Sequence, residues 1–382
     1  MRCGPVCAAL DEKYHHQPKN RPKKLSSSGS LRYTVTIPAI NRAREGAKPT
    51  NGGDIMTTST GRGLKALFAP IAIVAFGIGS AAQAQELSIA TGGTGGVYYP
   101  YGGGLAEVIN NHVDGYSASV EVTGASVENM ALVQRGDSDI AIALADTVYQ
   151  AYTGTGAFEG RQIGEARALA SIYPNAVQLV TLADSGITSM QDLRGQRVSV
   201  GAPGSGTELS AQIILAANGI TYDDFDPQRL NFNETADAIR DGDIVAGFWS
   251  VGPPTSSIMN LAATRAISII GLSADEIANA RAAEPTFAPF ALRAGLYDGM
   301  AEAVQTISTP NVLIVHADMD EELAYNITKA MYENVADLIA IHPAANDTTI
   351  DFSVASTPIP FHPGALRYLE EVGAAVQDHQ RP

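Results

Sequence analysis

The chain has 382 residues, of which 45% are hydrophobic and 17% charged, and its formal net charge at pH 7 is −15. This length allows about two to three domains, and the composition is that of a globular chain with a sizeable core, which excludes a largely disordered protein. Both cysteines, Cys3 and Cys7, lie close to the N-terminus. Disulfides, thiolate metal sites and a cysteine nucleophile are therefore excluded from the rest of the chain.

The beginning of the chain has the pattern of a leader. Residues 56–84 contain two basic residues, an apolar run from Ala66 to Ile78 and the closing Ala82-Gln83-Ala84. This is the plan of a secretory signal peptide, and the run is too short for a membrane span of about 20 residues. We therefore predict export to the periplasm with cleavage after about Ala84.

Residues 1–55 carry ten Lys/Arg against four Asp/Glu and show no periodic apolar face. A signal peptide behind such a segment would be unusual, so we interpret these residues as an extension that is not in the native protein, with translation starting at Met56. The alternative is a basic tail for nucleic acid. Without residues 1–84 the chain carries 13 Lys/Arg against 36 Asp/Glu, a net charge of −23 that argues against nucleic acid or anionic lipid as a partner.

From Glu86 onward, short apolar runs alternate with helical stretches. LSIAT, SASVEVT and DIAIAL predict three strands, and helices are expected near Gly102–Asn111 and Ser126–Arg135 between them. This order is typical of a doubly wound α/β domain. Residues 168–183 follow as a long β-prone run.

A second series of the same kind begins at residue 192. It contains a strand in DLRGQRVSVGA, a helix in GTELSAQIILAANG, a short helix in ETADAIRDGD, and strands in IVAGFWS and RAISIIG. A polar, proline-interrupted segment leads to NVLIVHA, which resembles a second crossing β run. A single helix is expected over 320–342, because its apolar residues form one stripe, and PFHPGALRYLEEVG predicts a short proline-led helix.

This order predicts an α/β, two-lobed protein with a hinge of two crossover segments and a central ligand cleft. We expect lobe 1 to comprise 86–180 plus 312–382, and lobe 2 to comprise 181–311. Ligands of open α/β sheets lie beyond the carboxyl ends of the strands. The expected ligand loops are 91–101, 123–129, 145–149, 201–208 and 249–254.

Two glycine-rich loops precede predicted helices. In TGGTGGVYYPYGGG, residues 91–104, the glycines permit close approach of a ligand, and free N–H groups at a helix start attract anions. Tyr98 stands where a dinucleotide fingerprint requires its third glycine, and a plain turn with packed tyrosines is the alternative. VSVGAPGSGTELSAQ lacks the lysine of a phosphate-binding P-loop, so it offers N–H groups and the hydroxyls of Ser205 and Thr207.

Other candidates for chemistry are weaker. The flanks of Ser205 do not match a hydrolase nucleophile elbow, and the histidines show no metal-ligand spacing, so we expect neither an enzyme nor a metal site nor a cofactor. Trp249 ends a predicted strand in GFWSVGPPT and could close over a ligand with Ser250 beside it. Capping the core of its lobe is the alternative role for Trp249.

Several of these stretches together resemble one family. ATGGTGGVYYPYGG, VENMALVQRGDSDIAIA, DLRGQRVSVGAPGSGTE, FWSVGPPT and FHPGALRYLEE are similar to successive signatures of the TAXI solute receptors, from about Glu86 to Gly373. These receptors are the extracytoplasmic substrate-binding subunits of TRAP (tripartite ATP-independent periplasmic) transporters. The resemblance implies a two-lobed periplasmic-binding-protein (type II-like) fold. It also implies a receptor that delivers a small solute to the large and small membrane subunits of such a transporter, with glutamate, glutamine or related dicarboxylates as solutes. The sequence leaves the oligomeric state open, and we favour a monomer.

Carried over by position, the resemblance places a set of residues around the ligand: Thr94, Gly95, Gly96, Tyr98, Tyr99, Ser126, Asn129, Tyr173, Ser205, Gly206, Thr207, Glu208 and Trp249. No arginine falls in the expected ligand loops, so a dicarboxylate would have both charges met by neutral groups alone. An amino acid with its ammonium group near Glu208 or Asp146 balances better, and we favour glutamate, glutamine or a relative. The alternatives are a dicarboxylate receptor, a binding protein that reports to a sensor kinase, and an enzyme on the same fold.

Overall fold

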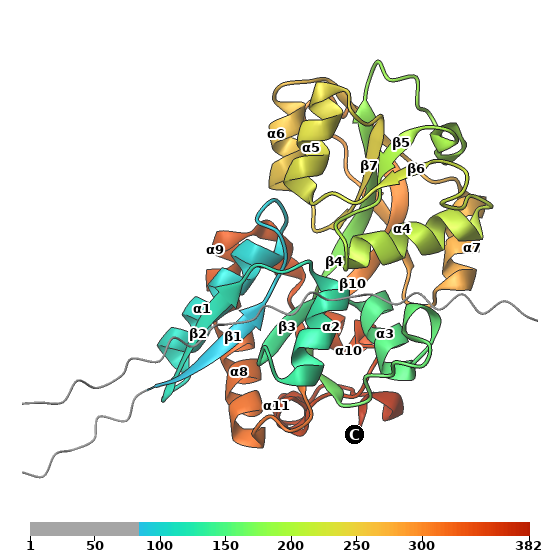
Figure 1. Ribbon diagram of the computed structural model, residues 1–382. Helices are drawn as coiled ribbons and strands as arrows, with labels where there is room; N and C mark the ends of the chain where they lie inside the picture. The colour runs from blue at the N-terminus through green and yellow to red at the C-terminus, as the bar shows by residue number, and fades with distance from the viewer. Residues whose placement is uncertain (1–83) are drawn as a thin grey trace, which may run out of the picture. The chain divides into compact units, whose positions relative to one another are not determined.

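The computed structural model describes residues 84–382 (Figure 1). The predicted extension at 1–55, and the predicted signal peptide apart from Ala84, lie outside this range. Within it, a mixed ten-stranded sheet has the order β2-β1-β3-β10-β4-β7-β5-β6, with β8 paired to β4 and β9 paired to β10. The strands are β1 (Gln85–Ala90), β2 (Tyr116–Glu121), β3 (Ile140–Leu144), β4 (Ala166–Leu182), β5 (Arg197–Ser199), β6 (Asp226–Gln228), β7 (Ala246–Val251), β8 (Ile267–Ile270), β9 (Ala288–Leu292) and β10 (Val304–His316).

Two groups of parallel strands define two lobes. In the first lobe β1 pairs in parallel with β2 and β3, and in the second lobe β5 pairs in parallel with β6 and β7. The helices of the first lobe are α1 (Tyr98–His112), α2 (Ser126–Arg135), α3 (Ala145–Thr153), α8 (Glu321–Glu333), α9 (Val335–Ile341), α10 (Ile350–Ser356) and α11 (Pro363–Glu371). Those of the second lobe are α4 (Gly206–Ala217), α5 (Phe232–Asp241), α6 (Ser256–Ala262) and α7 (Ala274–Ala283).

Two long strands run from one lobe into the other (Figure 1). β4 pairs antiparallel with β7 and β8 of the second lobe, β10 pairs antiparallel with β3 of the first, and the two pair with each other. Pro174 lies opposite Pro310, next to a shift in register. The predicted fold of two α/β lobes joined by two crossover segments is confirmed, whereas the boundaries at residues 180 and 311 remain a proposal because they fall inside these shared strands.

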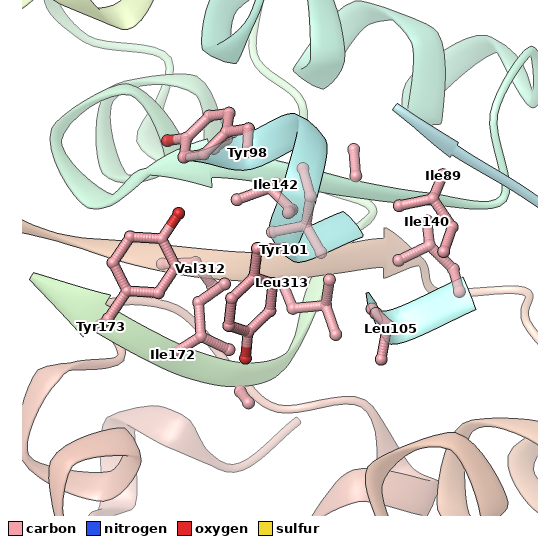
Figure 2. Packing of buried hydrophobic residues seen from close by; sticks show 14 of the residues in the cluster. Ile89, Tyr98, Tyr101, Leu105, Ile140, Ile142, Ile172, Tyr173, Val312 and Leu313 are labelled. Carbon is pink, nitrogen blue, oxygen red and sulfur yellow. The ribbon is translucent and has the colours of Figure 1, made fainter. Parts of the chain in front are cut away.

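The apolar residues form two buried clusters. One surrounds β1, β3, β4 and β10, and the other packs β5 and β7 against α4. Figure 2 shows the first cluster where α1 meets the crossing strands. There the rings of Tyr101 and Tyr173 lie 5.1 Å apart, centroid to centroid, with their hydroxyl groups pointing away from each other (Figure 2).

Three predicted elements differ from the observed ones. The helix expected over 320–342 is interrupted at Asn334, because the side-chain amide of this residue donates to the carbonyl oxygen of Ala330 and so satisfies the end of α8. α1 begins at Tyr98 and not near Gly102, since Pro100 falls in the first turn, where a missing N–H costs nothing. The polar, proline-interrupted segment, to which no element was assigned, contains α7, β9 and the start of β10.

None of the helices in residues 84–382 combines the length and the apolar character that a membrane span needs.

Candidate ligand-binding site

A cavity of about 340 Å³ lies between the lobes, at the carboxyl ends of their parallel strands. Its size is in the range of small-molecule sites. The first lobe contributes Gly92, Gly93, Gly96, Val97, Tyr98, Val122, Thr123, Gly124, Ala125, Ser126 and Leu144. The second lobe and the crossing strand contribute Asn175, Ala202, Pro203, Ser205, Gly206, Thr207, Asn231, Phe232, Glu234, Ser250 and Val251.

The start of α4 forms the polar wall of the second lobe. The hydroxyl oxygen of Ser205 accepts from the N–H of Glu208 at 3.1 Å and so caps the helix. The N–H groups of Gly206 and Thr207 find no acceptor among residues 84–382, and both residues line the cavity. Because these groups lie at the positive end of a helix dipole, they are suited to an anion.

The start of α2 faces α4 across the cavity, but the N–H groups of its second and third residues are occupied. The carbonyl oxygen of Gly204, from the second lobe, accepts from the N–H groups of Val127 and Glu128 at 3.1 and 3.2 Å. Gly206 packs tightly here, since a side chain at this position would come within 2.6 Å of the Ser126 hydroxyl oxygen. The two lobes therefore already touch through backbone at this edge of the cavity.

A chain of hydrogen bonds at the crossing strands connects the lobes at the floor of the cavity. The hydroxyl of Tyr98 donates to the side-chain oxygen of Asn311 at 2.6 Å, and the Asn311 amide donates to the side-chain oxygen of Asn175 at 2.7 Å. Asn175 in turn donates to the carbonyl oxygen of Ser250 at 2.9 Å. Burial raises the pKa of Tyr98 well above its usual range, so this hydroxyl stays protonated and keeps its donor role.

The hydroxyl of Ser250 is buried and has no hydrogen-bond partner among the described residues, and Ser250 lines the cavity. Only 5% of the residue is exposed. A buried polar group without a partner is costly, so it indicates a missing partner. Thr309 has a similar unpaired hydroxyl but does not line the cavity.

The segment before α5 forms a wall that the sequence did not predict. Asn231 caps α5 through its side-chain oxygen, and Glu234 accepts from the Asn231 N–H at 2.9 Å in a capping box. Between them, Phe232 stacks on Trp249 with 6.0 Å between ring centroids and 22° between planes. The signal was available, since N-x-x-E after a short strand marks a helix start, and β6 runs parallel to β5.

Of the fifteen predicted site residues, seven line the cavity and eight do not. Those at the cavity are Gly96, Tyr98, Ser126, Ser205, Gly206, Thr207 and Ser250. Those outside it are Thr94, Gly95, Tyr99, Asn129, Asp146, Tyr173, Glu208 and Trp249. Four of the five predicted loops reach the cavity, and 145–149 does not.

The residues outside the cavity have identifiable structural partners. The amide of Asn129 donates to the carbonyl oxygens of Thr91 and Ile142, and so braces two strand ends. The carbonyl oxygen of Gly95 accepts from Ser256 of α6. Thr94 faces Asn233 of α5, Tyr99 is exposed, and Tyr173 is buried against Tyr101.

Glu208 and Trp249 differ most from their expected roles. The carboxylate of Glu208 pairs with Arg229 at 2.6 Å, so its charge is already balanced. Trp249 is completely buried and its indole N–H donates to the Ser257 hydroxyl at 3.1 Å. The alternative that Trp249 caps the core of its lobe is therefore what the structure shows, and it supports the cavity through Phe232.

Asp146 belongs to a different interface between the lobes. It lies in the first turn of α3 and accepts from the hydroxyl of Ser210 on α4 at 2.5 Å and from the Thr147 N–H at 2.6 Å. Nearby, Gln150 of the same helix donates to the buried Glu284 carboxylate at 3.0 Å. Burial raises the pKa of Asp146 to about 7, the Ser210 hydroxyl offsets part of this rise, and the charge of Glu284 adds to it.

The described residues show no cluster of three or more His, Cys, Asp or Glu side chains that could hold a metal ion. The polar groups in the wall of the cavity are hydroxyls, amides and backbone groups, and Glu234 is the single carboxylate among its lining residues. This arrangement can orient and enclose a small polar molecule.

The sequence matches the model of the NMT1-like family over residues 89–373. The chain belongs to that family. Its structure is similar to a PhnD1 protein from Prochlorococcus marinus solved with methylphosphonate, with a TM-score of 0.47 at 9% identity over 69% of this chain and 91% of that one. It is also similar to a putative L-cystine ABC transporter protein from Listeria monocytogenes, with a TM-score of 0.45 at 14% identity over 69% and 95% of the two chains. The third example is the periplasmic aliphatic sulphonate binding protein SsuA from Escherichia coli, with a TM-score of 0.41 at 13% identity over 78% and 84%.

Proposed function

We propose that the protein is a periplasmic solute-binding protein that encloses a small carboxylate-bearing solute between its two lobes. The favoured solutes are glutamate, glutamine or a related amino acid. The observation that carries this proposal is that one interlobe cavity is lined by both the free N–H groups of Gly206 and Thr207 and the unpaired, buried hydroxyl of Ser250. A carboxylate at this place would satisfy both sets of donors.

Delivery of the solute to a membrane partner depends on its enclosure between the two lobes. A ligand that contacts both lobes favours the closed arrangement over the open one, and a membrane partner can distinguish the two shapes. The resemblance to TAXI receptors supports the large and small subunits of a TRAP transporter as that partner. We therefore propose that the monomeric protein, exported and cleaved near Ala84, delivers its solute to a carrier driven by an ion gradient.

A thermal-shift screen of the purified protein tests solute binding. The protein is first unfolded and refolded to remove carried-over ligand, and then measured with amino acids, dicarboxylates and small sugars. At a hundredfold excess over the dissociation constant, a ligand adds about 2.7 kcal/mol to stability. A shift with a carboxylate-bearing solute is expected, and its absence from every carboxylate in the screen would contradict the proposal.

Two variants link the binding to Ser250. Ser250→Ala removes a hydroxyl that has no partner in the structure, so stability should be unchanged or higher while ligand affinity falls roughly tenfold. Thr309→Val is the matched control, because it removes an equally unpaired buried hydroxyl outside the cavity and should leave affinity unchanged. Equal effects of both variants on affinity would show that the carboxylate does not contact Ser250.

Delivery needs a separate measurement. Membrane vesicles that contain the TRAP subunits are expected to take up the solute in the presence of this protein and an ion gradient, without ATP. Uptake that requires ATP would contradict the TRAP assignment and leave solute binding intact.

A further inference from the structure

The wall of the cavity is almost free of charge. Of the 22 residues that line it, none is Lys, Arg or His, and the ionisable ones are Tyr98 and Glu234. Tyr98 is held neutral by burial, and its hydroxyl donates a hydrogen bond to the side-chain oxygen of Asn311. No positively charged side chain in the wall can therefore balance a second carboxylate on the ligand.

The start of α4 offers the best-supported position for a carboxylate. There the free N–H groups of Gly206 and Thr207 lie on the same cavity as the unpaired hydroxyl of Ser250. At α2 the carbonyl oxygen of Gly204 already accepts from the N–H groups of Val127 and Glu128. In the loop before α1, Gly96 lies against an apolar ring, since a side chain at this position would meet Phe232 at 3.1 Å and Val251 at 3.6 Å.

The rest of the wall suits an uncharged body. Phe232 is fixed by its stack on Trp249, and the other apolar members of the wall are Val97, Val122, Ala125, Leu144, Ala202, Pro203 and Val251. Neutral polar groups stand among them, namely Asn175, Thr123 and Asn231. An ionised carboxylate against this surface would lose its hydration without gaining a partner of opposite charge.

Glu234 is the one fixed negative charge in the wall. Its orientation is set, because one carboxylate oxygen accepts from the N–H of Asn231 at 2.9 Å. No Lys, Arg or His within residues 84–382 forms a salt bridge with it, in contrast to Glu208, which pairs with Arg229. A ligand ammonium group would balance this charge, and a second ligand carboxylate would be repelled by it.

We infer that the ligand is an amino acid with a single carboxylate and an uncharged side chain, and that Glu234 selects it by facing its ammonium group. This inference rests on the proposed function and narrows it: glutamine, or an apolar amino acid such as leucine, is the ligand, and glutamate and 2-oxoglutarate are excluded. Glu234 acts as a specificity-determining residue at the edge of the cavity.

Matched ligands test the side-chain charge. Glutamine and glutamate have nearly the same shape, so calorimetric titration of the full, refolded protein with each isolates the second carboxylate. Glutamine or leucine is expected to bind at least about a hundredfold more tightly than glutamate. Tighter binding of glutamate, 2-oxoglutarate or succinate would overturn the inference while leaving carboxylate binding established, whereas no binding by any carboxylate would overturn the proposed function as well.

Glu234→Gln tests the ammonium contact. The glutamine amide oxygen can still accept from Asn231, so the capping box is retained and only the charge is lost. The variant should weaken glutamine binding about fivefold and leave binding of glutaramate, which is glutamine without its ammonium group, unchanged. Glu208→Gln is the matched control, because Glu208 lies in the first turn of α4, as Glu234 does in that of α5, but outside the cavity. Equal losses for glutamine and glutaramate, or no loss for glutamine, would show that Glu234 does not face the ammonium group.

Discussion

The interface between α3 and α4 predicts an unusual dependence of stability on pH. Asp146 is completely buried there, and its hydrogen-bond donors are the neutral groups of Ser210 and Thr147. The charge that acts on it is that of another buried acid, Glu284. Burial therefore raises the pKa of Asp146 from 3.8 to about 7. Asp146→Asn removes the ionisable group. Its amide oxygen can still accept from Thr147, and its NH2 group replaces the oxygen that accepts from Ser210, whose hydroxyl can then act as the acceptor.

The sign of the effect follows from proton uptake on folding. The folded chain binds this proton more tightly than the unfolded chain, so the contribution is complete below about pH 4 and is lost as the pH rises through about 7. The full contribution is about 4 kcal/mol. Between pH 8 and pH 5 the wild-type protein should gain about 2.6 kcal/mol that Asp146→Asn cannot gain. The variant should therefore be the more stable protein at pH 8, and its advantage should shrink by that amount at pH 5.

Urea unfolding followed by tryptophan fluorescence measures this difference, because Trp249 is the single tryptophan and is completely buried. Asp192→Asn is the control. Asp192 is exposed and its pKa is lowered by the N–H and hydroxyl groups of Thr188 and Ser189, so it stays ionised in both states over this range. The stability difference for Asp192→Asn should be the same at pH 5 and pH 8. A pH-independent difference for Asp146→Asn as well would refute the assignment of a raised pKa to this interface.

Three further substitutions test single contacts. Tyr98→Phe removes the hydroxyl that donates to Asn311 and should lower stability by about 1 kcal/mol in urea titrations; an unchanged midpoint would mean that this bond adds nothing. Glu208→Gln breaks a partly exposed ion pair with Arg229, so it should lower the free energy of unfolding by less than about 1 kcal/mol and leave ligand affinity unchanged. A large loss of affinity would show that Glu208 contacts the ligand. Gly206→Ala places a methyl group 2.6 Å from the Ser126 hydroxyl oxygen and 2.7 Å from Leu144. Calorimetry should therefore show about tenfold weaker ligand binding, while the circular-dichroism spectrum stays intact. Wild-type affinity would show that the lobes do not close at this point.

Much of the fold could be predicted because its elements are strongly periodic or unusually long. The run at 168–183 was expected to cross between lobes, and β4 spans Ala166–Leu182 and pairs with strands of both. The break at Asn334 could not be found by the same reasoning, since the apolar stripe continues through it. At the end of α8 the side-chain amide and the backbone N–H of Asn334 both donate to the carbonyl oxygen of Ala330, and such a local contact does not alter hydrophobic periodicity.

The loops at the cavity could be predicted where they follow runs of apolar residues. The loops after β1, β5 and β7 all reach the cavity, as does the loop before α2. The segment 231–234 was missed because β6, with the sequence DPQ, carries no apolar run, so its loop was not recognised as the end of a strand. Asp146 lies outside the cavity although it follows a clear strand, β3, because α3 starts at once and this carboxylate accepts from Ser210.

The charge of the chain and the charge of the cavity wall act on the ligand in the same direction. Residues 85–382 carry 36 Asp/Glu against 13 Lys/Arg, and the cavity wall contains one of these acids and none of the bases. The net negative field of such a chain disfavours the approach of a dianion, whereas a zwitterion has no net charge for that field to repel. Inside the cavity, Glu234 and the lack of positively charged side chains in the wall also favour a zwitterion over a dianion, at short range. Specificity against dicarboxylates would then come from both the surface and the site, and reversing it would require a new cation in the wall as well as the loss of Glu234.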